Sequence, residues 1–521
     1  MRGAANFHRF LNEKFMQQIN LLILLLFALP AAAQPLTPQK QPNIVYILAD
    51  DLGYNDLGCY GQKVIETPNI DALAKKGKLF TQHYTAAPVC APSRCMLLTG
   101  QHSGNAYVRG NDEWKERGDV WNYQAMFDNP RLEGQRPLPD SILTIAEVLQ
   151  QQGYRTGIFG KWGLGAPESE GTPNKQGFDT FYGYNCQRQA HTYYPMHLWS
   201  NDKRVLLNNN NVPPHANLAD DANPDDAKSY SDFSLQDYAP TLIHNEALAF
   251  IEDNSKQPFF LYYASPIPHV ALQAPKKWVN YYREKIGSEK PYTGTGYFPN
   301  QYPKATYAAM ISYLDEQVGD LVQKLKDEGV YEKTLIIFTS DNGPSDAGGA
   351  PTPFFDSASP FVTEFGRMKA FVYEGGIRIP MIASWEGKIN AGTTSDHQSS
   401  FYDFFATVCD LLKIDSPVTT DGISFLPELL DKKQRKHEFL YWEFPEHNGQ
   451  QAVRKGKWKA IRQNLKSGVI KTELYDLSID ISEQKDIAAQ YPKVVQELEN
   501  IMAAEHTVSP VERFQMEAID N

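Results

Sequence analysis

The clearest indication of the fold is the run Asn43-Ile44-Val45-Tyr46-Ile47-Leu48-Ala49-Asp50-Asp51. Its residues up to Ala49 are almost all apolar, on both of the faces that alternate along a strand. A run of this kind is typical of a strand that is covered on both sides. Because two carboxylates follow at once, the run predicts a buried strand that delivers acidic side chains to one edge of a sheet.

Three later runs repeat this pattern of an apolar strand followed by polar residues. Residues 156–159 lead into Gly160-Lys161-Trp162, residues 258–263 into Pro266-Ile267-Pro268-His269, and residues 334–339 into Asp341-Asn342-Gly343. Helical patterns lie between them at 141–152, 241–254 and 304–328. This alternation predicts an α/β sheet with helices on both faces, and ligands bind such sheets beyond the strand ends. We therefore expect the four polar clusters to meet at one site.

The last part of the chain has a different pattern. Residues 438–443, 451–454, 458–462 and 473–476 look like short strands separated by polar turns, and a helical pattern follows at 491–505. We predict a small α+β subdomain with an antiparallel sheet at 433–521, after a catalytic domain at 34–432. The polar segment 208–227 is expected to be a surface loop.

The N-terminus has the pattern of a signal peptide, which we place at residues 1–33. Arg2, Arg9 and Lys14 precede a short apolar core at 21–29, and small residues at 31–33 offer a cleavage site. That core is too short to span a bilayer, which takes about 20 apolar residues. We expect an exported bacterial protein, periplasmic or secreted, with no membrane span.

The net charge restricts the partners of this chain, and the cysteine content restricts its disulfide bonds. The formal net charge is −12, which argues against nucleic acid as a partner. An anionic substrate would need a locally basic site. Five cysteines are too few for a disulfide scaffold in an exported chain of this length, and the odd number leaves at least one unpaired or chemically converted.

The most informative motif is Cys90-Ala91-Pro92-Ser93-Arg94-Cys95-Met96-Leu97-Leu98-Thr99-Gly100. Pro92 suits the first turn of a helix, and Thr99-Gly100 suits its end. Residue 90 is therefore predicted at a helix N-terminus, where free N–H groups favour an anion. That effect is worth about 0.3–1 kcal/mol, enough to orient an anion but not to cleave it.

A metal site is predicted from four oxygen donors at two strand ends, namely Asp50, Asp51, Asp341 and Asn342. Ligands that are all oxygen select a hard cation, so we expect Ca²⁺, with Mg²⁺ as the alternative. Zn²⁺ fits less well because no His/Cys cluster has the spacing of its ligands.

From Asn43 to about Ala488 the chain resembles the formylglycine-dependent (type I) sulfatases of the alkaline-phosphatase-like superfamily. The resemblance rests on the Cys90–Gly100 motif, on Gly160-Lys161-Trp162 and on Glu374-Gly375-Gly376-Ile377-Arg378-Ile379-Pro380. It implies a large mixed sheet flanked by helices in a sandwich, with a smaller antiparallel sheet near the C-terminus.

The resemblance also implies the chemistry of the site. Cys90 would be oxidised to formylglycine (3-oxoalanine) by a formylglycine-generating or radical sulfatase-maturing enzyme. The hydrate of this residue would be the nucleophile and a metal ligand beside Asp50, Asp51, Asp341 and Asn342.

Further roles follow from the same resemblance. Arg94 would steady the formylglycine hydroxyl, and Lys161 and Lys369 would bind the sulfate. His269, with Lys369 as the alternative, would protonate the leaving alkoxide, since general acid catalysis is worth about 10²–10⁴ in rate. Lys161, His269 and Lys369 would then contact the substrate as well.

One residue departs from the family pattern. Many sulfatases have His after Gly-Lys-Trp, where it acts as a base in sulfate release, and this chain has Gly163. His191 and His197 are candidates either for that role or for substrate binding. Nearby aromatic residues, Tyr193, Tyr194 and Trp199, could stack on a sugar.

The function expected from these residues is hydrolysis of sulfate esters on a sulfated carbohydrate. A phosphatase or phosphonate monoester hydrolase on the same scaffold is one alternative. A non-catalytic binder of sulfated glycans is another. The sugar and the sulfated position depend on loops such as 111–137 and 187–201, whose sequences carry no readable code.

Overall fold

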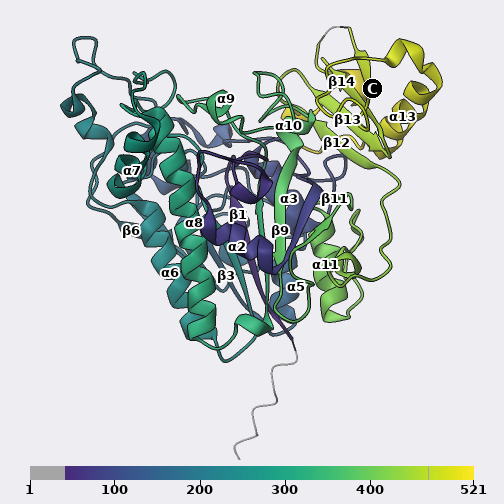
Figure 1. Ribbon diagram of the computed structural model, residues 1–521, viewed down its shortest axis with the longest axis horizontal. Coiled ribbons are helices and arrows are strands. Elements are labelled where there is room, and N and C mark those ends of the chain that lie inside the picture. Colours follow the sequence, from purple (N-terminus) through teal and green to yellow (C-terminus); the bar gives the residue numbers. More distant parts are fainter. Residues whose placement is uncertain (1–40, 468, 521) are drawn as a thin grey trace, which may run out of the picture. The chain divides into compact units, whose positions relative to one another are not determined.

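The computed structural model describes residues 41–467 and 469–520. The predicted signal peptide lies outside the described residues. From Pro42 onward the chain forms one compact unit. Figure 1 shows a central sheet with helices on both sides, and a second, smaller sheet with a helix near the C-terminal end.

An eleven-stranded mixed sheet is the centre of the described structure, with strands in the order β10-β2-β9-β8-β1-β7-β3-β4-β5-β6 and β11 paired to β2. The strands β8, β1, β7, β3 and β4 are parallel to their neighbours within this group. The bounds are β1 (Asn43–Ala49), β2 (Lys78–Tyr84), β3 (Arg155–Lys161), β4 (Thr180–Tyr184), β5 (His197–Ser200), β6 (Lys203–Leu206), β7 (Phe259–Ala264), β8 (Thr334–Ser340), β9 (Arg378–Ser384), β10 (Thr393–Ser395) and β11 (Ser399–Ser400).

The first strand shows why its sequence has no polar face. Ile44, Tyr46 and Leu48 of β1 belong to a core on one side of the sheet, and Val45 and Ile47 belong to a core on the other side. Both faces are therefore buried, and the apolar run is needed on each of them. The prediction of an α/β sheet covered on both sides is confirmed.

Helices supply the two covering layers. One core contains residues of α3, α5 and α11, and the other contains residues of α2, α6 and α8. The helix bounds are α2 (Pro68–Lys76), α3 (Cys90–Thr99), α4 (Tyr123–Asp128), α5 (Ile145–Gln151), α6 (Ala239–Asn254), α7 (Lys276–Ile286), α8 (Pro303–Asp327), α9 (Thr352–Phe355), α10 (Glu374–Ile377), α11 (Asp403–Leu412), α12 (Leu426–Leu429), α13 (Pro492–Glu505) and α14 (Glu517–Asp520).

The C-terminal strands form the predicted antiparallel sheet, in the order β12 (Leu440–Phe444), β13 (Gln450–Lys455), β14 (Trp458–Gln463) and β15 (Lys471–Asp476). One face packs on α13 through Val453 and Leu498. The other face, with Trp442, belongs to the core of the large sheet. The small sheet therefore shares its interior with the rest of the molecule, and a domain boundary near residue 433 stays a prediction.

The element bounds differ from the sequence expectation in ways that have local causes. The helix expected at 141–152 begins only at Ile145, because Thr144 is its N-cap: the Glu147 amide donates to the Thr144 hydroxyl, and the Thr144 amide donates to the Glu147 carboxylate. The strands β2 and β9 were not predicted. They carry polar residues such as Lys78, Gln82 and Arg378 within their runs.

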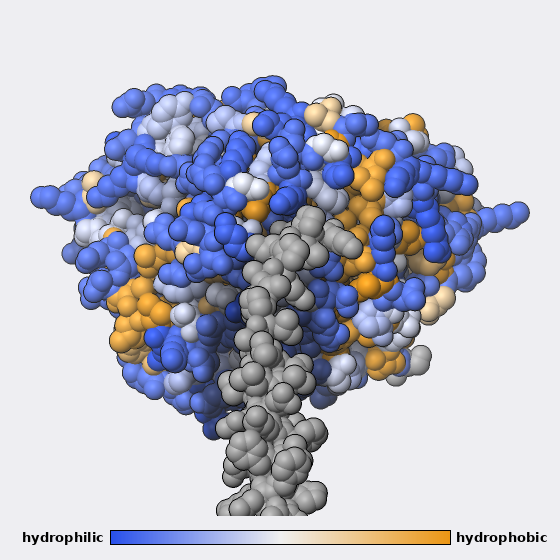
Figure 2. All heavy atoms as spheres, turned by 90° about the horizontal axis from the view of Figure 1, so that it is seen from below, coloured by the Kyte–Doolittle hydropathy of each residue, from blue (hydrophilic) through white to orange (hydrophobic). Residues whose placement is uncertain are grey.

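The surface in Figure 2 is mostly hydrophilic, with hydrophobic residues gathered in separate patches. Within the described residues, no helix combines the length and apolar character that a membrane span requires.

Candidate active site

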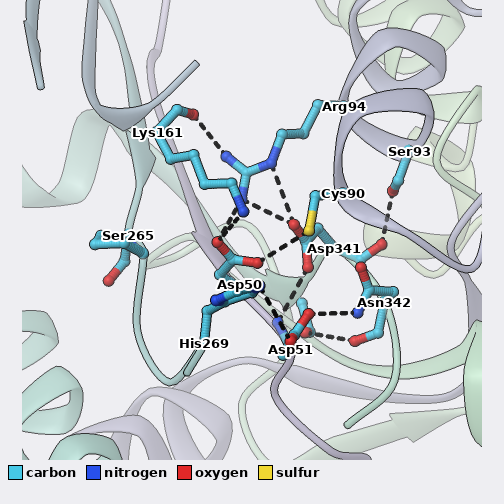
Figure 3. A network of polar contacts seen from close by, with 12 residues as sticks. Asp50, Asp51, Cys90, Ser93, Arg94, Lys161, Ser265, His269, Asp341 and Asn342 are labelled. Carbon is cyan, nitrogen blue, oxygen red and sulfur yellow. Dashed lines mark hydrogen bonds and ion pairs between the residues drawn. The ribbon is translucent and has the colours of Figure 1, made fainter. Parts of the chain in front are cut away.

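The four polar clusters predicted from sequence meet at the carboxyl ends of neighbouring parallel strands. Asp50 follows β1, Lys161 ends β3, His269 follows β7 and Asp341 follows β8. These strands lie side by side in the order β8-β1-β7-β3. Figure 3 shows the side chains pointing toward one another around Cys90. The convergence that the sequence predicted is therefore observed.

Cys90 is the first residue of α3, as predicted. Val89 before it is extended, and Gly100 after the helix adopts a left-handed conformation (φ 70°), which glycine adopts without steric cost. The hydroxyl groups of Thr85 and Ser93 both donate to the backbone carbonyl of Asp341 at 2.6 and 2.7 Å. These bonds attach the start of α3 to the end of β8, and the Cys90 Sγ lies 3.3 Å from the Asp50 Oδ1.

Three buried carboxylates at this edge are each paired with a cation. The Lys161 Nζ lies 2.6 Å from the Asp50 Oδ2, and the Lys369 Nζ lies 2.7 Å from the Asp51 carboxylate.

The third carboxylate, Asp341, is held by Arg94, whose guanidinium lies 2.8 Å from the Asp341 Oδ2. The same guanidinium donates to the backbone carbonyl of Lys161 at 2.7 Å. The negative charges of the three carboxylates are thus balanced before any ligand binds.

The donor set fits a hard divalent cation. The Asn342 Oδ1 is buried and has no hydrogen-bond partner among the described residues, while its Nδ2 donates to Asp51 at 2.8 Å. Ligand atoms of Asp50, Asp51, Cys90 and His269 lie within 4.8 Å of one another. A buried amide oxygen without a partner beside carboxylates is the arrangement that Ca²⁺ or Mg²⁺ would complete.

Burial and neighbouring charges shift the protonation of the site. Burial, with the charges of Asp341 and Asp50, raises the pKa of the Cys90 thiol. An unmodified thiol here stays protonated and is a weak nucleophile. Burial and Asp50 also raise the pKa of Asp341, to about 6.

The two lysines remain charged despite their surroundings. Burial acts to lower the pKa of Lys161, but the charge of Asp50 acts in the opposite direction and the pKa is raised above its usual value. Burial also acts to lower the pKa of Lys369. The charge of Asp51 outweighs this effect of burial and raises the pKa of Lys369 well above the usual value. Both side chains therefore offer permanent positive charge to an anion.

His269 is held by its backbone and by stacking. The Tyr193 hydroxyl donates to the carbonyl oxygens of Pro266 and His269, both at 2.6 Å. The ring of His191 stacks on that of His269, with centroids 5.1 Å apart and planes at 11°. Sequence reasoning singled out Tyr193 for sugar stacking; in the structure it is buried and positions the His269 segment.

The second histidine candidate lies elsewhere. His197 is buried in β5, where its Nε2 lies 2.9 Å from the Glu133 Oε2. Trp199 donates to the other oxygen of Glu133 at 2.6 Å. These contacts support a structural role for His197 and give no support to substrate contact, whereas His191 lines the cleft described below.

Gly163 has a steric reason to lack a side chain. Its φ is 86°, and a Cβ placed there would lie 2.6 Å from the Gln187 Cγ. The Gln187 side chain thus occupies the space beside Gly163 that a larger residue would need. The sequence alone offered no signal for this residue.

A cleft of ≈ 450 Å³ opens over Cys90. Lys161, His191, His269 and Lys369 lie in its walls. Further lining residues come from segments far apart in the chain, including Asn111, Trp121, Gln187, Phe365, Phe371, Glu446, His447 and Arg513. The C-terminal residues therefore help to build the cleft.

Comparison with known proteins agrees with this arrangement. The family model Sulfatase matches residues 42–414, which is most of the chain. The chain belongs to the sulfatase family. It is therefore a type I sulfatase of the alkaline-phosphatase-like superfamily and a sulfuric ester hydrolase. A second model, described as N-sulphoglucosamine sulphohydrolase, C-terminal, matches residues 364–507 of this sulfatase.

Among curated relatives, the sulfatase is 34% identical to arylsulfatase A of Homo sapiens over 82% of this chain and 76% of the relative. It is 30% identical to N-acetylgalactosamine-6-sulfatase of Rattus norvegicus over 85% of this chain and 75% of the relative. A crystal structure of Ps i-CgsB in complex with k-i-k-neocarrahexaose superposes with a TM-score of 0.69 at 26% identity, covering 92% of this chain and 95% of that one.

Proposed function

We propose that this sulfatase hydrolyses sulfate esters on a carbohydrate, with residue 90 as its nucleophile. The observation that carries the proposal is the position of Cys90, at the start of α3 and 3.3 Å from Asp50. Lys161, Lys369 and Arg94 surround it with positive charge. The names of the relatives support a carbohydrate, because they include an N-acetylgalactosamine sulfatase and a protein in complex with an oligosaccharide.

Conversion of Cys90 to formylglycine is part of the proposal. The raised pKa of the thiol leaves little thiolate, so the unmodified residue would attack sulfur poorly. The hydrated aldehyde would supply a hydroxyl nucleophile at the same position. Because Cys90 is only 2% exposed, we propose that the maturing enzyme acts before the chain folds.

The metal proposal assigns Asp50, Asp51, Asp341, Asn342 and residue 90 as ligands of Ca²⁺ or Mg²⁺. A divalent ion would act as a Lewis acid on a sulfate oxygen. Since the three carboxylates are already balanced by three cations, the ion would also leave the site with net positive charge. The acidic chain would thereby gain the local attraction that an anionic ester needs.

Lys161 and Lys369 are proposed to hold the sulfate group, and His269 to protonate the leaving alkoxide. The His269 Nδ1 faces the carbonyl oxygen of Val270, so its Nε2 carries a proton only in the imidazolium form. Burial and the charge of Lys369 lower the pKa of His269. A bound sulfate would oppose that shift. Lys369, which stays charged, is the alternative donor.

We also propose that the sulfatase is exported, on the basis of the pattern at residues 1–33 alone. The enzyme would then bind its metal ion and its substrate outside the cytoplasm. Detection of a mature chain that begins at Gln34, by N-terminal sequencing of the exported protein, would support this. A chain retained in the cytoplasm with Met1 intact would contradict it.

Two measurements test the proposed function. We expect sulfate esters to be turned over in preference to the matching phosphate and phosphonate esters; a preference for phosphate would favour the alternative hydrolase. We expect mass spectrometry of the peptide that contains Cys90 to show 3-oxoalanine. A protein with unmodified Cys90 that binds sulfated glycans without turnover would instead be a binder.

A further inference from the structure

Three rings line one part of the cleft and contact one another. The ring centroids of Phe365 and Phe371 are 5.7 Å apart, and those of Phe371 and His447 are 5.0 Å apart. All three residues line the cleft that contains Cys90. We call these three side chains the aromatic wall. None of them belongs to the charged groups that would hold the sulfate.

The end of the aromatic wall is exposed to an unusual degree. Phe365 is 77% exposed, more than any other aromatic side chain among the described residues that stand out as exposed. A single exposed apolar side chain is normal on a protein surface. Phe365, however, continues a surface of contacting rings inside a concave site, which is where a ligand would cover it.

The backbone holds the aromatic wall close to residue 90. The Ala370 amide donates to the carbonyl of Pro88 at 2.9 Å, two residues before Cys90. From the small sheet, the buried Gln450 side chain donates to the Ala370 carbonyl at 2.9 Å and accepts from the Val372 amide at 3.2 Å. These hydrogen bonds hold the backbone on both sides of Phe371 and tie it to the segment that precedes residue 90.

Much of the rest of the cleft lining is polar. It includes Asn111, Glu113, Gln187, Ser345, Asp346 and Arg513. A wholly apolar group would leave these donors and acceptors without partners. A sugar matches both parts, because one face of a pyranose ring presents C–H groups while its hydroxyls point to the sides.

We propose that the aromatic wall is the stacking platform for the sugar ring that carries the sulfate, and that it makes this enzyme selective for ring-bearing esters. This proposal rests on the proposed function. With the sulfate held by Lys161 and Lys369, the ring would lie against Phe371 and His447, and Phe365 would cover its outer end. Phe365 is a binding residue in this scheme and takes no part in bond breaking.

The test compares Phe365→Ala with Phe354→Ala, a matched loss of an exposed phenylalanine outside the cleft. Phe354 is 46% exposed. The substrates are sulfated monosaccharides, glycerol sulfate as a ringless ester with a similar leaving group, and 4-nitrophenyl sulfate. For Phe365→Ala we expect KM for the sugar sulfates to rise about tenfold with little change in kcat. The ratio of kcat/KM for sugar sulfate to that for glycerol sulfate falls accordingly, whereas Phe354→Ala keeps it.

Two results would overturn the proposal. One is an unchanged ratio in Phe365→Ala. The other is a loss that is larger for 4-nitrophenyl sulfate than for every sugar sulfate, which would make the wall an aryl-binding surface. His447→Asn provides a second variant at the other end of the wall, since asparagine tolerates the positive φ (48°) at this position.

A binding experiment separates this proposal from the proposed function. Ligand-observed NMR with the same sulfated monosaccharides needs no turnover. If the wild type hydrolyses no sulfate ester, the proposed function fails, and weaker binding by Phe365→Ala than by Phe354→Ala still supports the wall. Equal binding by the two variants, or no binding by the wild type, overturns it.

Discussion

The protein contains two clusters of buried charge that differ in one respect. The first is the candidate active site, where Asp50, Asp51 and Asp341 meet Lys161, Lys369 and Arg94. The second joins the two sheets: the Lys459 ammonium lies 2.9 Å from Glu374 and 2.8 Å from Glu483. Each residue of this second cluster is at most 2% exposed. Ion pairs in both clusters are largely withdrawn from solvent, but only the first cluster is reached by the cleft.

The difference shows which buried charges have a ligand to bind. In the second cluster Glu374 also accepts from Tyr84 at 2.7 Å and contacts Arg378 at 3.2 Å, and Lys459 is fully buried. In the first cluster the Asn342 Oδ1 has no partner in the described part of the chain, and Lys161 and Lys369 face the cleft. Burial of charge therefore occurs in the core as well as in the site, and access from the cleft distinguishes the two clusters.

The strongest test replaces the proposed nucleophile. We expect Cys90→Ala to lower kcat by about 10⁴-fold or more, since no other group can take the place of the attacking atom. Its thermal midpoint should change by only a few degrees. Cys409→Ala, which removes a buried thiol from α11, should keep activity. Substantial turnover by Cys90→Ala would refute the assignment of residue 90.

The proposed role of His269 as proton donor is tested by varying the leaving group of the ester. We expect His269→Gln to lower kcat by about 10²–10⁴ for sugar sulfates, whose alkoxide needs a proton. The loss should be much smaller for 4-nitrophenyl sulfate, whose leaving group is stable without one. Losses of the same size for both esters would mean that His269 acts only through structure or binding, and would move the role to Lys369.

A mutation in the second cluster, formed by Lys459, Glu374 and Glu483, should lower the stability of the fold and leave catalysis unchanged. Lys459→Met removes the cation that Glu374 and Glu483 share and leaves Glu483 buried without it, which should cost about 3–5 kcal/mol of unfolding free energy. Urea denaturation measures this, and the folded fraction should keep its kcat. Lys455→Met on the same sheet removes a partly exposed partner of the exposed Glu438 and Glu497 and should cost about 0–1 kcal/mol. An equal loss of unfolding free energy in the two variants would contradict the distinction between a buried and a surface ion pair.

The smallest effect concerns pH. Burial raises the pKa of Glu483 from 4.5 to about 7, so the folded state binds a proton more tightly than the unfolded state does. This contribution to stability is complete below pH 4.5 and is lost as pH rises toward 7. Glu483→Gln should therefore flatten the fall in unfolding free energy between these values. The same slope in both proteins would show that Glu483 titrates normally.

Much of the fold was predictable because its strands are buried on both faces. The runs that end at Asp50, Lys161, His269 and Asp341 have no polar face, and this local property identifies them. Strand β2, which carries half-buried polar residues such as Gln82, lacks that property. Helix α3 was predictable because Pro92 and Gly100 are local signals for a helix start and end.

Side-chain partners were less predictable. The sequence offered His197 as a base or a substrate-binding residue and Trp199 as a ring for sugar stacking, yet both contact Glu133, which lies more than 60 residues earlier in the sequence. The motif residues of the active site could be named from their resemblance to a family. Gln187, which fills the space beside Gly163, belongs to no motif and has no local signal.

By itself, the amino-acid sequence determined the buried strands, the helix that begins at Cys90 and the charged residues that follow the strand ends. These depend on neighbours within a few residues. Only the tertiary structure decided that Phe365, Phe371 and His447 form one surface, and that Lys459 is enclosed while Lys369 is open to the cleft. Such contacts join distant segments, and their energies depend on which atoms the fold brings together.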